Sequence, residues 1–519
     1  MSLTRDITTV GGGTLMSRLL AFGRDAGIAA LLGTTPFSEA FFAMLQVINF
    51  FRRLLAEGAL NGAFVPIWLK LHKRKNGAAA ANHFTLRSLI AMFGITGVIT
   101  IATTVFAWFV IGAVAPGFDE SRRALGSYLL LLASPYIVLS GLVAVLAAAL
   151  NAERRVFAVT ASTVMFNVVM VAAVITFFDA DLRAGEITLL LAATIVLAGL
   201  VQFLVASVAW LAFAKPWRGF RERVPGQTIV FFRRALPGLI ATGIPQLKMI
   251  AATAIVSGSP AAVSWLYYAN RLYELPLGVV SIAVASVIVP RIATSVHEGD
   301  SVAFAASQSR AYEIALGLAL PAAAGFAVLA EPIAGGLFEH GAFSKDDTAA
   351  VATALMAICA GLPGHVLDKV FGAVSFAHED TRTPMFTALG GLAAAIICGL
   401  TLYFLFGFAG AAAAIAVSGW VGAALLGITL YRRGWLRLDD DAARRLRLIL
   451  LSTVVMGFAV ATILMAAPLL SQAAFASSLG RLSIVVVLVA FGVAIYATAL
   501  HVTGVIRLKD LVMALRRDA

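Results

Sequence analysis

Four arginines inside long apolar segments are the residues of this sequence best suited to bind a ligand. They are Arg18, Arg24, Arg52 and Arg271. An ionised side chain inside a membrane-spanning segment costs roughly 3 kcal/mol, so its presence needs a physical reason. A guanidinium group offers planar, paired donors that match phosphate and carboxylate oxygens. The four arginines therefore predict an anionic ligand, and a phosphate-bearing ligand is favoured.

Further polar residues in the same segments are expected to support these arginines. They are Ser17, Asp25, Glu39, Asn49, Arg53, Glu57, Asn270 and Glu274. On a helix, Arg271 and Glu274 share a face at a spacing of three. Arg53 and Glu57 do so at a spacing of four, which fits a ligand site and an internal ion pair equally well. For the four arginines as a group we favour a ligand site, because few carboxylates lie near them in the sequence.

The composition places the chain in a membrane. Of its 519 residues, 61% are hydrophobic and 13% are charged, whereas a soluble chain has about 25% charged residues. About fourteen segments can cross roughly 30 Å of hydrocarbon as helices. They begin near Thr8, Ser38, Phe84, Ala124, Val156, Glu186, Thr228, Ala262, Gln308, Asp347, Pro384, Ala409, Leu446 and Arg481. We expect an all-α polytopic membrane protein whose first segment is retained, because no signal-peptide cleavage motif follows it.

Basic residues gather in alternate connections between the apolar segments. The largest groups are Lys70 to Lys75, Arg154 with Arg155, Lys215 to Arg223, Arg432 to Arg445, and Arg507 to Arg517. By the positive-inside rule these connections are cytoplasmic, which predicts that both termini are cytoplasmic. A nucleic-acid partner is not expected, since the net charge of +12 is dispersed between spans. The two cysteines, Cys359 and Cys398, lie singly, and neither a metal nor another cofactor is expected.

Similar tracts recur about 226 residues apart. Phe41-Phe42-Ala43 resembles Tyr267-Tyr268-Ala269, and Asn151-Ala152-Glu153 resembles Ala377-His378-Glu379. A repeat of six helices keeps its orientation in both copies, as in transporters with parallel repeats. We therefore predict two pseudo-symmetric six-helix lobes, residues 1–225 and 226–436, followed by a C-terminal helix pair, residues 437–519.

Several of these tracts resemble the MurJ (also called MviN) lipid II flippase family. They are TLMSRLLAFGRD from Thr14, EAFF from Glu39, NFFRRLLAEGALNGAFVPI from Asn49, APGF from Ala115 and SWLYYANRLYELPLGV from Ser264. The resemblance implies a fourteen-helix fold of the multidrug/oligosaccharidyl-lipid/polysaccharide exporter superfamily, with a groove for the polyprenyl tail on the last two helices. It also implies that the four arginines line a cavity, with Glu57 and Glu274 as cavity acids. Two positions depart from the family pattern: Glu39, where aspartate is commoner, and Ala158, where proline is common.

The resemblance implies a transporter rather than an enzyme. The expected activity is movement of lipid II, the undecaprenyl-pyrophosphate-linked peptidoglycan precursor, from the cytoplasmic to the periplasmic leaflet of the bacterial inner membrane by alternating access. An exporter of another lipid-linked oligosaccharide and a cation-coupled drug exporter are the alternatives, and the arginine excess argues against the second. A membrane scaffold and an enzyme acting on lipid-linked sugar are further alternatives. The expected partners are lipid II, membrane lipids and proteins of cell-wall synthesis.

One lysine remains open to two interpretations. Lys248 has no acidic neighbour in the sequence. As a fixed charge it would supply what a bound sodium ion supplies elsewhere in the superfamily, and so contribute to coupling. Alternatively its stem packs in the lobe and its ammonium group reaches a backbone carbonyl near Pro245.

Overall fold

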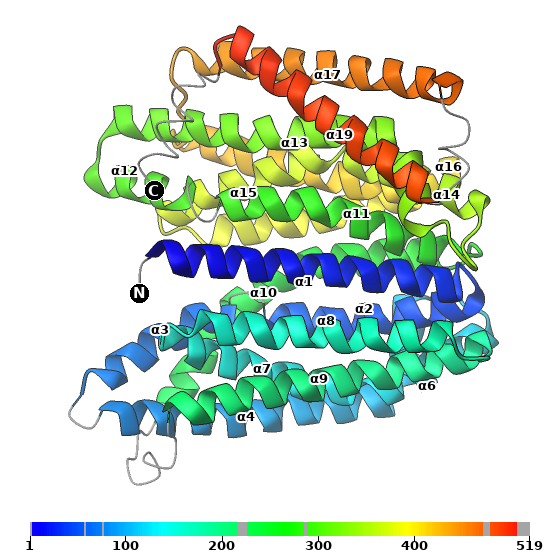
Figure 1. Ribbon diagram of the computed structural model, residues 1–519. Coiled ribbons are helices and arrows are strands. Elements are labelled where there is room, and N and C mark those ends of the chain that lie inside the picture. The colour runs from blue at the N-terminus through cyan, green and yellow to red at the C-terminus, as the bar shows by residue number, and fades with distance from the viewer. Residues whose placement is uncertain are drawn as a thin grey trace. The chain divides into compact units, whose positions relative to one another are not determined.

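The computed structural model describes residues 3–56, 59–74, 77–214, 226–284, 288–470 and 478–505. Within these ranges the regular elements are helices and no strand occurs (Figure 1). The prediction of an all-α protein is therefore confirmed. The chain forms two compact units, Met1–Ala261 and Ala262–Ala519, here called unit 1 and unit 2.

Unit 1 begins with a long helix and continues through pairs of helices that meet at short breaks. Its helices are α1 (Leu3–Leu32), α2 (Pro36–Ala56), α3 (Ala59–His72), α4 (Gly77–Val105), α5 (Ala107–Val114), α6 (Glu120–Ala133), α7 (Pro135–Ala152), α8 (Val156–Phe178), α9 (Ala184–Ala214) and α10 (Gln227–Val256). Pro135 stands at the first position of α7, where a missing N–H costs nothing, so a new helix starts there.

Unit 2 contains the remaining helices. They are α11 (Ala262–Ala283), α12 (Val289–Glu298), α13 (Ser301–Phe338), α14 (Lys345–Cys359), α15 (Leu362–Ala377), α16 (Arg382–Arg432), α17 (Ala442–Leu470) and α19 (Ser478–Val502). The 51 residues of α16 are interrupted at Gly407, whose φ of 61° is not helical. A continuous helix of that length would measure about 76 Å, more than twice the hydrocarbon thickness. We therefore count α16 as two helices.

Ten helices in the described ranges are long and apolar enough to cross a membrane, or eleven if the bent α10 is one span. The bend in α10 is 41°, and this helix contains Pro237 and Pro245, which remove helical hydrogen bonds. The charged helices α1 and α11 are not among the ten. The count of about fourteen spans stays a prediction, and it depends on α1, α11 and the division of α16.

The helix α10 packs within unit 1. Its Phe231 lies edge-on to Phe64 of α3, with ring centroids 5.5 Å apart. Beyond its other end, the Gly117 N–H donates to Ser257 Oγ at 2.8 Å. A Cβ on Gly117 would lie 2.3 Å from neighbouring backbone, so this approach requires glycine. The predicted lobe boundary at residues 225–226 lies before α10, whereas unit 1 extends to Ala261.

Two turns repeat the same backbone hydrogen bonds in the two units. At the end of α7, the N–H of Arg155 donates to the carbonyl five residues before it, and that of Arg154 to the carbonyl three residues before it. Asp380 and Glu379 do the same at the end of α15. Arg154 and Glu379 both have φ of 60°, as the Schellman motif requires. Glu379 follows Arg154 by 225 residues, one fewer than the offset of the sequence repeat, and the two-lobe repeat stays a prediction.

The C-terminal helices α17 and α19 pack against α13 and against each other (Figure 1). Pro321 inside α13 has no N–H, which leaves the Gly317 carbonyl without its helical donor. The Tyr496 hydroxyl of α19 donates to that carbonyl at 2.8 Å. Near the other end of α13, Arg481 pairs with Glu339 at 2.8 Å. Two polar contacts therefore fasten α19 along α13.

Candidate functional site

Arg24 of α1 is held by polar neighbours on two helices. Its Nη2 and Nε lie 2.7 and 2.9 Å from Asp25 Oδ1. Its Nη1 donates to Asn167 Oδ1 of α8 at 3.4 Å, which is a long hydrogen bond. The Arg24 side chain is 12% exposed and that of Asp25 is 2% exposed. The guanidinium is therefore fixed in place, and the adjacent carboxylate offsets its charge.

Asn167 was not predicted, although it connects two of the predicted residues. Its Nδ2 donates to Ser17 Oγ at 3.0 Å and to the Ser17 carbonyl at 3.3 Å. It is buried in an otherwise apolar stretch of α8. The helices α1 and α8 approach closely at Gly27, because glycine has no side chain. A Cβ at this position would lie 2.3 Å from the Val174 side chain. A single amide in an apolar stretch was the only signal in the sequence.

Arg52 of α2 is oriented by a neutral amide. Its Nε donates to Asn49 Oδ1 at 3.2 Å, one helical turn earlier. The charges of both Arg52 and Arg24 act on the hydroxyl of Tyr136, which is buried in α7. Two of the predicted arginines, from α1 and α2, are therefore brought to the surroundings of one side chain.

Three other predicted residues of unit 1 lie close in the sequence to Arg24 or to Arg52. Arg18 is half-buried on α1, and its side chain makes no hydrogen bond or ion pair with any described residue. Arg53 is half-buried in the last turn of α2. Glu57 lies outside the described residues, so its predicted pairing with Arg53 stays a prediction.

Glu39 lies in a different part of α2. It precedes Arg52 by thirteen residues, which is about 20 Å along a helix. Its Oε2 accepts from Arg122 Nη1 at 2.9 Å, and Arg122 also pairs with Asp119. Hydrogen bonds from Arg122 and Ser121 lower the pKa of Asp119 to about 2. Glu39 therefore belongs to a separate ion cluster of unit 1, which is joined by Arg122, a residue not among the predicted site residues.

Arg271 of unit 2 is paired on its own helix. Its Nη1 lies 3.0 Å from Glu274 Oε2, and Asn270 Nδ2 donates to Glu274 Oε1 at 3.1 Å. Both members of the ion pair are about one-fifth exposed, at 20% and 24%. The shared helix face that the spacing of three predicted is confirmed. The Glu274 carboxylate offsets the charge of Arg271. The small number of carboxylates near the four arginines in the sequence had led us to give this pairing too little weight.

Lys248 and the polar residues of α15 lie on different units. Lys248 is half-buried on α10, three residues after Pro245. In unit 2, His365 Nδ1 lies 2.9 Å from the Tyr273 hydroxyl and 3.0 Å from the Gly361 carbonyl. The coupling role of Lys248 stays a prediction.

The arrangement in unit 1 suits an anion. Asp25 offsets Arg24, while Asn49 orients Arg52 and Asn167 orients Arg24 without removing charge. Charge-assisted hydrogen bonds between guanidinium groups and the oxygens of an anionic ligand are stronger than those between neutral groups. Unit 1 therefore offers preoriented guanidinium groups inside apolar helices.

The sequence profile of a known family, described as "Lipid II flippase MurJ", matches residues 28–502. This chain belongs to the MurJ lipid II flippase family. The probable lipid II flippase MurJ of Rhizobium meliloti (strain 1021) is 37% identical over 481 residues, which cover 91% of this chain and 89% of that protein. That of Rhizobium tropici is 35% identical over 467 residues, with 88% and 86% covered. The predicted family resemblance is thereby confirmed.

Solved structures support the MurJ fold. A lipid II flippase MurJ in an inward closed conformation matches with a TM-score of 0.77 at 21% identity, covering 97% of this chain and 99% of that one. An inward-facing multidrug resistance MATE family transporter of the MOP superfamily matches with a TM-score of 0.68 at 14% identity, covering 80% and 94%. At these identities the likeness concerns the fold alone.

Proposed function

We propose that this chain translocates lipid II from the cytoplasmic to the periplasmic leaflet of the bacterial inner membrane. The observation that supports it most directly is the set of oriented arginines on α1 and α2 in a chain of the MurJ family. Lipid II carries a pyrophosphate, and arginine donors match phosphate oxygens in pairs. In this proposal Arg18, Arg24, Arg52 and Arg271 bind the pyrophosphate.

The neighbouring residues act on the substrate through these arginines. Asn167 and Asp25 hold Arg24, and Asn49 holds Arg52, so that their donors are fixed before the substrate arrives. Fixed donors lose less conformational entropy on binding than free arginine side chains. Asn270 and Glu274 set the position of Arg271 in the same way.

The polyprenyl tail stays in lipid while the head group crosses. We assign the tail to the C-terminal pair α17 and α19, and the termini to the cytoplasm. The division into residues 1–225, 226–436 and 437–519 follows the repeat in the sequence. The helix α10 belongs to the second lobe by this repeat but packs with the first. A membrane potential that is negative inside favours outward movement of about two negative charges by roughly 4 to 5 kcal/mol per 100 mV.

Reconstituted vesicles provide the test. Fluorescent lipid II is placed in both leaflets, and the fraction accessible to an outside reagent is followed with the purified full chain and with Arg24→Ala. We expect translocation by the wild-type chain and its loss in the variant. Asn151→Leu is the matched control, because the Asn151 side chain makes one hydrogen bond among the described residues, to Asn61 Oδ1 at 3.4 Å, and lies near the end of α7. Wild-type vesicles that behave like empty ones would exclude the proposed function.

A further inference from the structure

A small pocket in unit 2 contains two arginines that the proposed function does not use. It lies between α12 and α13, and its volume is about 220 Å³. Arg291, Arg310 and Ser307 provide its polar wall, and Ile288, Ala306 and Ile314 are among its apolar residues. The pocket therefore combines cationic donors with an apolar surface.

The charge of these arginines is only partly offset. Arg310 Nη1 pairs with Glu313 at 3.0 Å, but the Arg310 side chain is 53% exposed. Its other nitrogens make no hydrogen bond with a described residue. Arg291 is exposed, and its side chain makes no hydrogen bond or ion pair with any residue of the described ranges. Both guanidinium groups therefore retain donors for a ligand.

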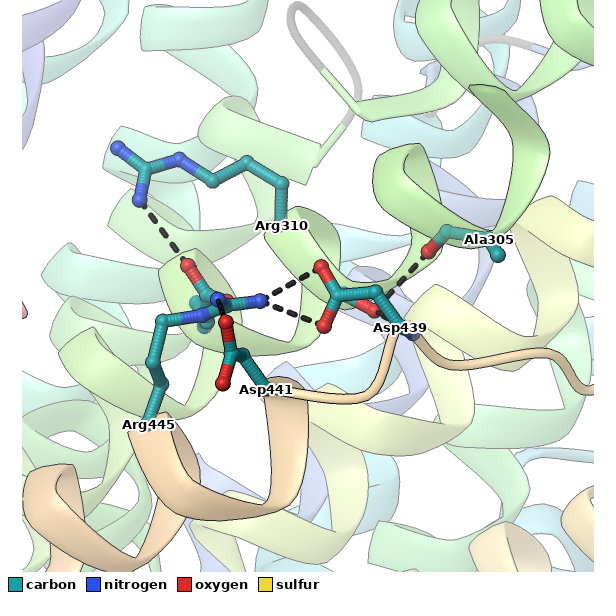
Figure 2. Close-up of polar contacts among 7 residues, drawn as sticks. Ala305, Arg310, Asp439, Asp441 and Arg445 are labelled. Carbon is teal, nitrogen blue, oxygen red and sulfur yellow. Dashed lines mark hydrogen bonds and ion pairs between the residues drawn. The ribbon is translucent and has the colours of Figure 1, made fainter. Parts of the chain in front are cut away.

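The nearby acids are engaged by a third arginine. Arg445 pairs with Glu313 and with Asp439, the latter at 2.6 Å, and it lies 3.8 Å from Asp441. Figure 2 shows Arg445 beside Asp439 and Asp441, whereas Arg310 extends on the other side of the cluster. Glu313 is thus shared between Arg310 and Arg445, and Asp439 and Asp441 face Arg445. None of these three acids is among the residues that line the pocket.

The position of Arg310 along α13 corresponds to a membrane interface. The 38 residues of α13 measure about 57 Å, while the hydrocarbon core measures about 30 Å. If the core is centred on the helix, about ten residues on each side of residue 320 lie in hydrocarbon. Arg310 then stands at the hydrocarbon edge, where lipid phosphates lie, and Arg291 belongs to α12 at the same end of α13.

The volume restricts the occupant. A pocket of 220 Å³ equals about seven waters at roughly 30 Å³ each, and ligand pockets for drug-sized molecules are larger, at about 300 to 1,000 Å³. A sugar-peptide head group does not fit, whereas a single phosphate with the beginning of its glycerol ester does. The apolar residues suit the first methylene groups of the lipid chains.

We propose that Arg291 and Arg310 bind the phosphate of an anionic phospholipid in this pocket, separately from the translocated substrate. The Ser307 hydroxyl adds a donor; its Oγ lies 3.2 Å from Ser295 Oγ. Arg310 can be replaced without leaving Glu313 alone, because Arg445 still contacts it.

The test measures lipid retention by native mass spectrometry of the full chain in detergent, titrated with phosphatidylglycerol, phosphatidylcholine or inorganic phosphate. We expect Arg291→Gln/Arg310→Gln to bind phosphatidylglycerol at least about tenfold more weakly, since two sets of charge-assisted hydrogen bonds to the phosphate are lost. Ala306→Phe should weaken binding similarly, because it fills the pocket and leaves both charges in place.

The matched control is Arg432→Gln/Arg447→Gln, which removes two exposed arginines of the same unit outside the pocket. Wild-type binding in the control together with loss in both pocket variants supports the site. Equal phosphatidylglycerol binding in all variants overturns it. Inorganic phosphate that binds as tightly as the lipid, with the same dependence on the two arginines, overturns the lipid assignment. Translocation of lipid II is recorded in parallel, so that failure of this site is distinguished from failure of the proposed function.

Discussion

Replacing Asn167 by aspartate tests whether the charge near Arg24 is set for an anionic ligand. The side chain keeps its shape, but a carboxylate replaces the oxygen that now lies 3.4 Å from Arg24 Nη1. A phosphate oxygen bound on the far side of that guanidinium would lie about 2.8 Å from it, hence about 6 Å from the new charge. At an effective dielectric constant of about 20, the repulsion is about 3 kcal/mol per phosphate charge.

That repulsion corresponds to roughly 100-fold weaker binding. Asn167→Leu is the comparison: it removes the contacts with Arg24 and Ser17 without adding charge, and should cost about 1 kcal/mol, or a factor of about five. The assay is a titration of the purified full chain with lipid II, accompanied by thermal unfolding to verify that each variant is folded. If folded Asn167→Asp bound lipid II as tightly as the wild type, an anion site at Arg24 would be refuted.

Four further outcomes are expected. Arg24→Ala should abolish complementation of flippase-depleted cells and Arg24→Lys should restore it only partly, because lysine keeps the charge but not the paired donors; full activity of the alanine variant at normal expression would contradict this. Tyr496→Phe should lower the free energy of unfolding by about 1 kcal/mol, and should be nearly neutral in a Pro321→Ala background, where the carbonyl regains a helical donor; a double-mutant cycle by thermal unfolding measures the coupling. The pKa of Asp119 is lowered to about 2 from 3.8, so its ion pair stabilises the fold above about pH 4 and is lost as the pH falls toward 2; Asp119→Asn should flatten the acid dependence of unfolding in that window. Lys248→Met should impair translocation more than lipid II binding, with or without sodium, and unchanged translocation would exclude a coupling role.

Local spacing allowed the pair of Arg271 and Glu274 to be predicted, since residues three apart on a helix must share a face. The partner of Arg24 was out of reach for the same method. Asn167 lies 143 residues away, and only the packing of α1 on α8 brings it near. Arginine types and positions were thus readable from the sequence, but the neutral groups that orient them were not.

The helix α10 illustrates a second limit. The second copy of the sequence repeat begins just before Gln227, and the predicted lobe boundary therefore lies there. Packing follows side chains instead, and Phe231 lies against Phe64 of α3 in unit 1. A repeat boundary and a packing boundary are set by different physical causes, so the first does not predict the second.

The attachment of α19 to α13 has a mechanical consequence. Contacts at Tyr496 and Arg481 prevent α19 from sliding along α13, because a shift of one turn would break both. A lipid tail held along the C-terminal pair would then move together with unit 2, at a constant distance from Arg271. Any change in the distance between tail and head group during a transport cycle would have to come from the lipid's own flexible chain or from unit 1. The length of the isoprenoid would therefore limit how far the head group can move, and this limit can be measured.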